Sequence, residues 1–222
     1  MSGSRPGRTV GVIFSRIDLR RALRMRNPPD LFELRLDALV HCLDTVKTAI
    51  RDLPAPLIVT ARHPREGGVN ALSAAERRAL LLEFLPYAAY VDVELRSLRY
   101  SGVVLQRART NHIPTIVSHH DLKDTPTLSR LNALVCVARS AGANIIKIAT
   151  RTDTASQLER LLEFLDANRA GANMALMGIG KLGRVSRVEL ARRGSSLNYA
   201  HLGRPQTAGQ LSLRDLQRLS ND

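Results

Sequence analysis

The amino-acid sequence predicts an α/β protein that folds as a (β/α)8 barrel, the TIM-barrel architecture, with residues 1–222 forming a single domain. Short β-branched runs recur eight times along the chain, and segments with the apolar spacing of helices separate them. No linker-like segment divides the chain, and 44% of its residues are hydrophobic, which is enough for one sizeable core. Eight alternating strand and helix units favour a closed barrel over an open sheet.

The eight predicted strands are short runs rich in β-branched and apolar residues. In chain order they are Thr9–Phe14, Leu31–Asp37, Leu57–Arg62, Tyr90–Leu95, Pro114–His120, Asn144–Thr150, Asn173–Ile179 and Ser196–Leu202. Between them, segments such as 72–85, 127–142 and 154–171 repeat apolar residues at the spacing of amphipathic helices. Ser73, in the sequence SAAE, predicts a capping box at the start of the first of these helices, and Gly142 predicts the end of the second.

The composition bears on the class of partner. The 33 basic and 20 acidic residues give a net charge of +13, which would suit nucleic acid. We predict no nucleic-acid partner, because the arginines are scattered along the chain and only 4% of the residues are aromatic. The charge is interpreted instead as solvated helix surface that also attracts an anionic substrate.

Membrane and metal partners are not expected either. No apolar run reaches the roughly eighteen residues of a membrane span, and Met1–Val10 lacks the apolar core of a signal peptide. A cytoplasmic protein is therefore predicted. Cys42 and Cys136 have neither the number nor the spacing of a disulfide framework or a zinc site, so we predict no metal.

Charged side chains alternate with apolar ones in several predicted strands. Residues two apart in a strand share a face, so Glu33, Arg35 and Asp37 point to one side. This side must face the barrel interior, because the other side packs against the helices. Inside the barrel, ionisable groups cost free energy unless they pair with one another or meet a polar ligand. The same parity groups Thr60 with Arg62, Asp92 with Glu94, and Ser118 with His120. The sequence therefore predicts a charged barrel interior.

Lys147 lies inside the apolar run of the sixth predicted strand, in a chain that has only four lysines. Burial disfavours the ammonium form and leaves more neutral amine, which is the form that attacks a carbonyl group. The alternative is a structural lysine, either ion-paired inside the barrel with Glu94 or Asp37, or at an edge in water. The residues alone leave both interpretations open.

Two further features point to chemistry at one end of the barrel. His119 and His120 end the fifth strand, at the edge where barrel enzymes have their active sites, and only one of them can point inward. A histidine there can take and return a proton, although an isolated histidine is more often structural. The glycines of Met177–Arg187 suit a bound anion, and Arg187 can hold a carboxylate; an ordinary loop with a surface arginine is the alternative.

Seven segments, in this order, resemble the type I 3-dehydroquinate dehydratases. They are ELRLD, TARHPREGG, VDVEL, SHHDLKDTP, IIKIA, MGIGKLGRVSR and AGQLS, and they run from Glu33 to Ser212. The resemblance implies a barrel enzyme, often dimeric, that dehydrates 3-dehydroquinate to 3-dehydroshikimate without metal or cofactor. It also implies that Lys147 forms a Schiff base with the substrate ketone, that His120 is the general acid and base of a syn elimination, and that Glu66 orients His120.

The resemblance further implies a set of substrate-binding residues. Arg187 would hold the substrate carboxylate, and Met177 and Tyr199 would be apolar walls. The residues matched to hydroxyl contacts or their supports are Glu33, Arg35, Arg62, Gln206 and Gln210. The chain departs from the family pattern at Leu122, Ile179 and 206–208, and Ser15 is a guess for an early serine contact of the family.

Two other functions remain compatible with the residues. A Schiff-base aldolase of the same barrel class would use the same lysine on a phosphorylated sugar, and its products would differ from those of a dehydratase. A basic barrel that binds nucleic acid would explain the net charge. It would not explain charged residues that point inward.

Overall fold

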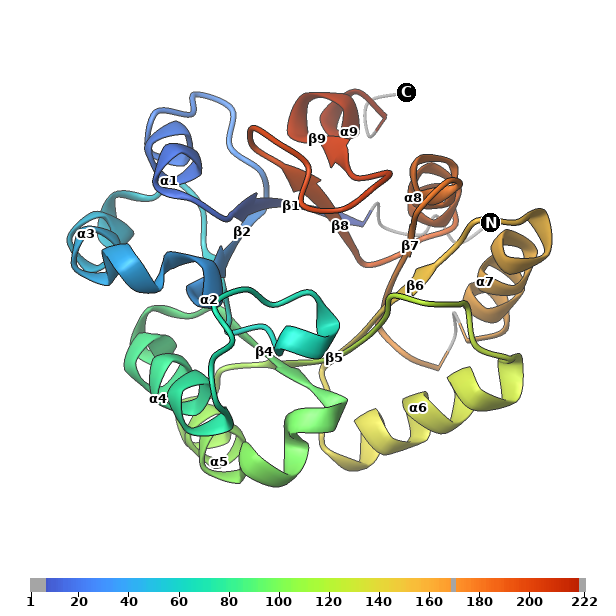
Figure 1. The fold of residues 1–222 in the computed structure, drawn as a ribbon, viewed down its shortest axis with the longest axis horizontal. Helices are drawn as coiled ribbons and strands as arrows, with labels where there is room; N and C mark the ends of the chain where they lie inside the picture. The colour runs from blue at the N-terminus through green and yellow to red at the C-terminus, as the bar shows by residue number, and fades with distance from the viewer. Residues whose placement is uncertain (1–6, 169–170, 220–222) are drawn as a thin grey trace.

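The computed structural model describes residues 7–168 and 171–219. Within these ranges all the strands belong to one parallel sheet, in the order β7-β6-β5-β4-β3-β2-β1-β8-β9. The sheet curls into a ring, and the helices surround it on the outside (Figure 1). The predicted barrel is confirmed.

The eight barrel strands match the predicted ones to within two residues at each end. They are β1 (Arg8–Ile13), β2 (Leu31–Arg35), β3 (Leu57–Thr60), β4 (Tyr90–Glu94), β5 (Thr115–Asp121), β6 (Ile145–Arg151), β7 (Met174–Ile179) and β8 (Leu197–His201). The short strand β9 (Leu211–Ser212) pairs with β8 and was not predicted, because two residues carry no readable alternation.

The helices lie between consecutive strands and after the last one. They are α1 (Arg16–Leu23), α2 (Leu36–Leu39), α3 (Leu43–Ala49), α4 (Ala74–Phe84), α5 (Gly102–Thr110), α6 (Leu128–Ser140), α7 (Ala155–Asn168), α8 (Gly183–Arg192) and α9 (Leu213–Leu219). Short 3-10 turns add η1 (Val40–Cys42), η2 (Ile50–Asp52), η3 (Pro64–Glu66), η4 (Leu85–Tyr87) and η5 (Leu95–Tyr100). The predicted capping box is present, since Ser73 Oγ accepts from Glu76 N and Glu76 Oε2 accepts from Ser73 N. Gly142, at φ 82°, follows the end of α6 as predicted.

The strand alternation divides the core into two parts. Phe32 and Leu34 of β2 point outward and pack with helix residues such as Phe84. Inside the ring a second apolar cluster includes Leu31 and Ile116. Charged side chains sit further along the same strands, so the carboxyl ends of the strands form the polar part of the barrel.

The ring closes between β7 and β8, which are neighbours without a strand ladder. One backbone bond spans them, from Ser196 N to Met174 O (2.7 Å). Beside it, the buried hydroxyl of Ser195 accepts from Leu176 N (3.0 Å) and donates to Leu176 O (3.2 Å). A side chain thus satisfies a peptide group that has no partner strand at this position.

One inward residue was assigned to the wrong element. Strand β2 ends at Arg35, and Asp37 lies in α2 because Leu-Asp-Ala-Leu readily forms a helical turn. Asp37 still meets Arg35 through two hydrogen bonds of 2.9 and 2.8 Å, and it accepts the backbone N–H groups of Arg62 and Val69. Although burial acts to raise the pKa of Asp37, these bonds hold it below its usual value. Asp37 therefore braces the loop after β3.

The membrane prediction is tested only in part. In the described ranges, no helix combines the length and apolar character that crossing a bilayer requires. Residues 1–6 of the segment Met1–Val10 lie outside the described residues.

Candidate active site

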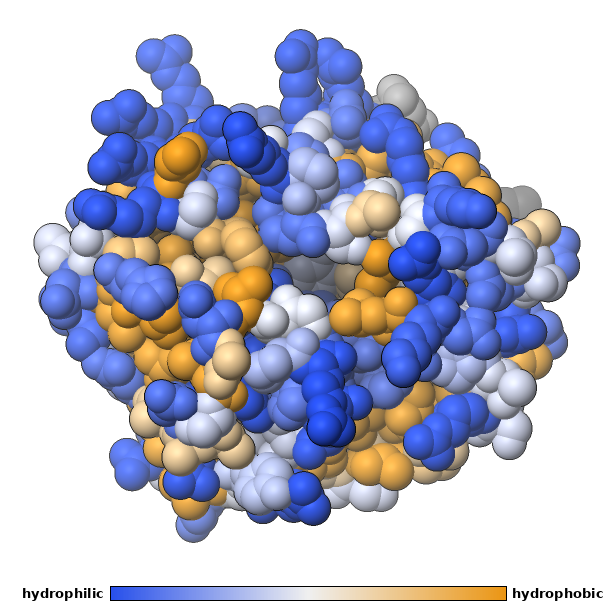
Figure 2. All heavy atoms as spheres, viewed as in Figure 1, coloured by the Kyte–Doolittle hydropathy of each residue, from blue (hydrophilic) through white to orange (hydrophobic). Residues whose placement is uncertain are grey.

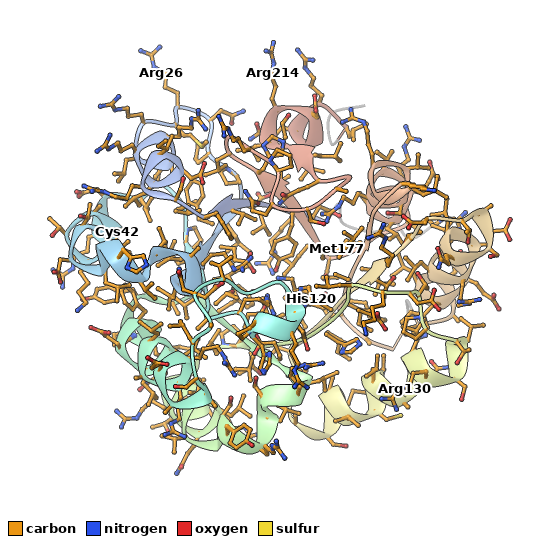
Figure 3. All side chains as sticks on the ribbon, viewed as in Figure 1. Arg26, Cys42, His120, Arg130, Met177 and Arg214 are labelled. Carbon is orange, nitrogen blue, oxygen red and sulfur yellow. The ribbon has the colours of Figure 1, made fainter. Side chains whose placement is uncertain are left out.

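A cavity of about 340 Å³ opens at the carboxyl ends of the barrel strands. Figure 2 shows the corresponding face hollowed near its centre, and Figure 3 shows His120 and Met177 near the middle of the ring. All the predicted site residues line this cavity: Glu33, Arg35, Arg62, Glu66, His120, Lys147, Met177, Arg187, Tyr199, Gln206 and Gln210. Strand parity directs those on strands inward, and the closure of the barrel brings them together with those just after β3, on η3, on α8 and in the loop after β8.

Lys147, from β6, is 2% exposed and lies between two carboxylates. Its Nζ is 2.8 Å from Glu33 Oε1 and 3.0 Å from Asp92 Oδ2, and it lies 3.9 Å from the centroid of the Tyr199 ring. An internal ion pair is therefore present, but its partners differ from the predicted Glu94 or Asp37. Since Lys147 also lines the cavity, the pairing does not remove it from the site.

Arg62 is the second buried cation of this network. It lies 2.9 Å from Asp92 Oδ2 and 3.4 Å from Glu94 Oε1, and it donates to Ser118 Oγ at 2.7 Å. Burial alone would raise the pKa of Asp92, but the charges of Arg62 and Lys147 hold it below its usual value. The inward charges of neighbouring strands thus neutralise one another, as a buried ionic network requires.

His120 forms a pair with Glu66 at the mouth of the cavity. Turn η3 places Glu66 above the end of β5, where its Oε2 accepts from both the backbone N and the Nδ1 of His120, each at 3.0 Å. An ionised Glu66 only accepts hydrogen bonds, so this form of the pair has the ring proton of His120 on Nδ1 and a free lone pair on Nε2. His119 is outside the cavity lining, so the prediction that only one of the two histidines points inward is confirmed.

The electrostatics of the pair keep the imidazole neutral. Burial, together with the cations Arg62, Lys147 and Arg35, lowers the pKa of His120 well below its ordinary value. Burial raises the pKa of Glu66 to about 7, against the opposing charge of Arg62. A neutral imidazole with an open Nε2 is suited to act as a general base.

Arg187, from α8, is 6% exposed, which rules out a surface arginine. Its Nη1 donates to Tyr199 O at 3.1 Å, whereas its Nε is buried and has no hydrogen-bond partner among the described residues. Burial lowers the pKa of Arg187 to about 10, and none of the ion pairs found among the described residues includes this side chain. A buried guanidinium edge with an unused donor is suited to bind an anion.

The loop between β8 and β9 covers one side of the cavity. Gln210 Oε1 accepts from Gln206 N at 2.8 Å, so this side chain holds the loop. The Oε1 of Gln206 is buried and has no hydrogen-bond partner among the described residues. Gly209 adopts φ 82°, and a Cβ there would lie 2.6 Å from Gly183 Cα, so only glycine allows the loop to rest on the start of α8.

The structure does not support one guess, Ser15, and one of two open interpretations, the anion-binding glycine loop. Ser15 does not line the cavity; it caps α1, where its Oγ donates to Asp18 Oδ2 (2.7 Å) and accepts from Asp18 N (3.2 Å). The spacing Ser-x-x-Asp was a readable signal for this N-cap. The glycine loop after β7 does not offer its amides to an anion, because the N–H groups of Gly178, Gly180 and Gly183 donate to protein oxygens.

One cavity residue, Arg151, and one residue just outside the lining, Arg96, were not predicted. Arg151 lines the mouth and pairs with Asp153 at 2.7 Å, and its parity with Lys147 in β6 was the available signal. Arg96 lies just after β4 and donates to Glu66 Oε1 at 2.7 Å; as a turn residue it carried no such signal. The described residues contain no group of three or more His, Cys, Asp or Glu side chains that could hold a metal ion.

Comparison with known proteins places this geometry in a family. Residues 16–221 match the type I 3-dehydroquinase family. The 3-dehydroquinate dehydratase of Methanothermobacter thermautotrophicus is 31% identical over 83% of this chain and 80% of that protein. That of Pyrococcus abyssi is 33% identical over 85% of this chain and 85% of that protein.

Solved structures agree on the fold. The type I 3-dehydroquinate dehydratase of Clostridium difficile has a TM-score of 0.85 to this chain at 22% identity, covering 100% of this chain and 93% of that one. At this identity the likeness supports the barrel, and the sequence matches carry the assignment. The chain belongs to the type I 3-dehydroquinase family.

Proposed function

We propose that this family member dehydrates 3-dehydroquinate to 3-dehydroshikimate through a Schiff base on Lys147, with His120 as general acid and base. One observation carries the proposal. A buried amine, an imidazole with a free Nε2 and a guanidinium with an unused donor all line one cavity of about 340 Å³.

The first step joins Lys147 to the substrate ketone. The amine must be neutral to attack, and Glu33 and Asp92 lie within hydrogen-bond distance to accept its proton. Addition of Nζ to the carbonyl carbon followed by loss of water gives an iminium. The positive iminium withdraws electrons from the adjacent carbon and makes its C–H bond more acidic.

The second step is the elimination. Nε2 of His120 removes the proton from the carbon adjacent to the iminium, and the resulting enamine expels the hydroxyl one carbon further on. His120 returns the proton to that hydroxyl, which leaves as water. Because the same imidazole removes the proton and protonates the hydroxyl, both leave from the same face of the substrate, and the elimination is syn. Hydrolysis of the product iminium then releases 3-dehydroshikimate and restores the amine.

Two of the unpartnered polar atoms on cavity-lining residues support the substrate orientation, and the hydroxyl of Tyr199 is a third such atom. Arg187 Nε and Gln206 Oε1 are buried without hydrogen-bond partners among the described residues, and both residues line the cavity. Buried polar groups are normally satisfied, so a ligand is expected to complete them. The substrate carboxylate would bind Arg187, and a substrate hydroxyl would donate to Gln206 Oε1.

The remaining contacts follow from position in the cavity. The other hydroxyls of the substrate would be bound or supported by three charged residues of the cavity lining, Glu33, Arg35 and Arg62. Gln210 would act chiefly through the loop it holds. Met177 and Tyr199 would form the apolar walls on either side of the ring.

Steady-state kinetics of variants test the proposal. Lys147→Ala should lower kcat by at least about a thousandfold, and His120→Ala by about a hundred- to ten-thousandfold, when formation of 3-dehydroshikimate is followed. Lys181→Ala, which changes an exposed lysine on the loop after β7, is the matched control and should keep wild-type turnover. A Lys147→Ala enzyme with near wild-type kcat would exclude this mechanism.

A further inference from the structure

Arg96 is a charged residue at the edge of the site that the proposed mechanism does not use. It lies in η5, directly after β4, and its side chain is 36% exposed. Its Nε donates to Glu66 Oε1 at 2.7 Å, whereas the Glu66 side chain is completely buried. Arg96 does not line the cavity, so it has no direct contact with a bound substrate.

The Glu66 carboxylate is divided between two partners. Oε1 takes the Arg96 guanidinium, and Oε2 takes both hydrogen bonds from His120. With Oε1 occupied, the carboxylate is fixed against rotation, and Oε2 stays directed at Nδ1 of His120. We infer that Arg96 is a positioning residue of the acid–base pair, which fixes the orientation and the negative charge of Glu66 so that His120 keeps its proton on Nδ1. The inference rests on the proposed role of His120.

The charged groups around Glu66 come from four elements. Arg62, after β3, and Arg96, in η5, favour the carboxylate, whereas Glu94, at the end of β4, opposes it. His120, in β5, pairs with Glu66 through Nδ1. Burial raises the pKa of Glu66 to about 7 even with both arginines present, so the loss of Arg96 should raise it further.

Arg96 also acts on two histidines next to the pair. Burial is the main cause of the lowered pKa of His63, which precedes η3, and of His119 in β5, and the charge of Arg96 lowers both further. Neither histidine contacts Glu66 through its ring in the described structure. Their own titration can still affect the pH profile of kcat and must be separated from that of Glu66. In a double variant that lacks both rings, the effect of Arg96 on the profile should persist.

The test is the pH dependence of kcat and KM for 3-dehydroquinate. In Arg96→Met the acidic limb of the kcat profile should move up by about one pH unit, because a protonated Glu66 no longer accepts from Nδ1 of His120. The kcat plateau at high pH and KM should stay within about twofold of wild type, since Arg96 does not touch the substrate.

Matched variants separate positioning from structure. Arg96→Lys keeps the charge, so its acidic limb of the kcat profile should lie close to the pH position found in wild type. Arg99→Met removes another exposed arginine of η5, one stacked on Tyr100, and should leave the profile unchanged. Should Arg96→Met fail to fold, Arg96→Gln, which keeps a donor without charge, should shift the limb in the same direction.

An acidic limb that does not move in Arg96→Met or Arg96→Gln would overturn the inference. So would a kcat that falls equally at every pH. These outcomes differ from failure of the proposed function, in which wild-type protein makes no 3-dehydroshikimate or His120→Ala keeps full turnover. Nitrogen NMR of the His120 ring in the substrate-free protein gives an independent reading: Nδ1 should remain protonated to lower pH in wild type than in Arg96→Met.

Discussion

At the scale of single residues, the site is a set of buried charges that stabilise one another only together. Lys147 and Arg62 share the carboxylates of Glu33 and Asp92, and Arg62 also reaches Glu94. Removing one member leaves its partners charged and buried, which costs more free energy than the pair contributed. The same arrangement keeps Lys147 beside groups that can accept its proton.

Asp92→Asn tests this interdependence through stability. The variant should lower the free energy of unfolding at pH 7 by about 3 to 5 kcal/mol, because Arg62 and Lys147 lose a shared carboxylate. The pKa of Asp92 is held below 3.8 in the fold, so the unfolded chain takes up a proton first. Its contribution is therefore present above about pH 4 and is lost as the pH falls.

Urea denaturation at pH 7 and pH 3 is the measurement. Wild type should lose more stability than Asp92→Asn between the two values, and Asp44→Asn, an exposed change on α3, should follow wild type. Equal stability of Asp92→Asn and wild type at pH 7 would contradict the account.

Strand alternation was enough to predict which residues face inward, but not which of them meet. Glu33 and Lys147 are 114 positions apart in sequence, and the stagger of the closed barrel determines that they pair. Ser15 was a guess for a ligand contact, and it overlooked the Ser-x-x-Asp spacing that indicates an N-cap. Arg96 was missed because the direction of a side chain in a turn cannot be read from residue spacing.

At the scale of elements, the strands were predictable because their composition and flanking turns are regular. Their ends were less so: β2 gives way to α2 before Asp37, since helical propensity takes over within the same run. The closure between β7 and β8 leaves no sequence signal, because a hydroxyl of Ser195 substitutes for a ladder bond.

Ser195→Ala tests that closure. Without the hydroxyl, the N–H of Leu176 loses its acceptor at a buried position, so the free energy of unfolding should fall by about 1 to 3 kcal/mol. Each kcal/mol corresponds to a Tm lower by about 2 to 4 °C for a chain of this size. Thermal denaturation should show this loss, with KM unchanged because Ser195 does not line the cavity. Ser140→Ala, at the exposed end of α6, is the control. An equal Tm for both variants would show that the closure between β7 and β8 does not depend on Ser195.

At the scale of the whole molecule, the chain carries a net charge of +13, and its cavity contains the buried guanidinium of Arg187. Figure 3 shows Arg26 and Arg214 extending outward at the rim, away from the ring of strands. Surface charge of this kind acts at a distance, through the field it adds around the cavity, and salt screens it. The homodimer and the cytoplasmic location expected from the sequence stay predictions.

The salt dependence of the kinetics tests this role of the charge. Raising the ionic strength from about 0.01 to 0.5 M should lower kcat/KM for 3-dehydroquinate by up to about tenfold and leave kcat nearly unchanged. The double variant Arg26→Gln/Arg214→Gln should show a weaker dependence. A kcat/KM that does not respond to salt would mean that the positive surface has no part in substrate capture.

The central claim, that the amine of Lys147 bonds covalently to the substrate, is tested most directly by borohydride reduction during turnover of 3-dehydroquinate. Peptide mapping by mass spectrometry should find the reduced adduct on the peptide that contains Lys147, with Lys123 and Lys181 unmodified and no adduct when the substrate is omitted. An enzyme that makes 3-dehydroshikimate at full rate in borohydride, with Lys147 unmodified, would contradict the account.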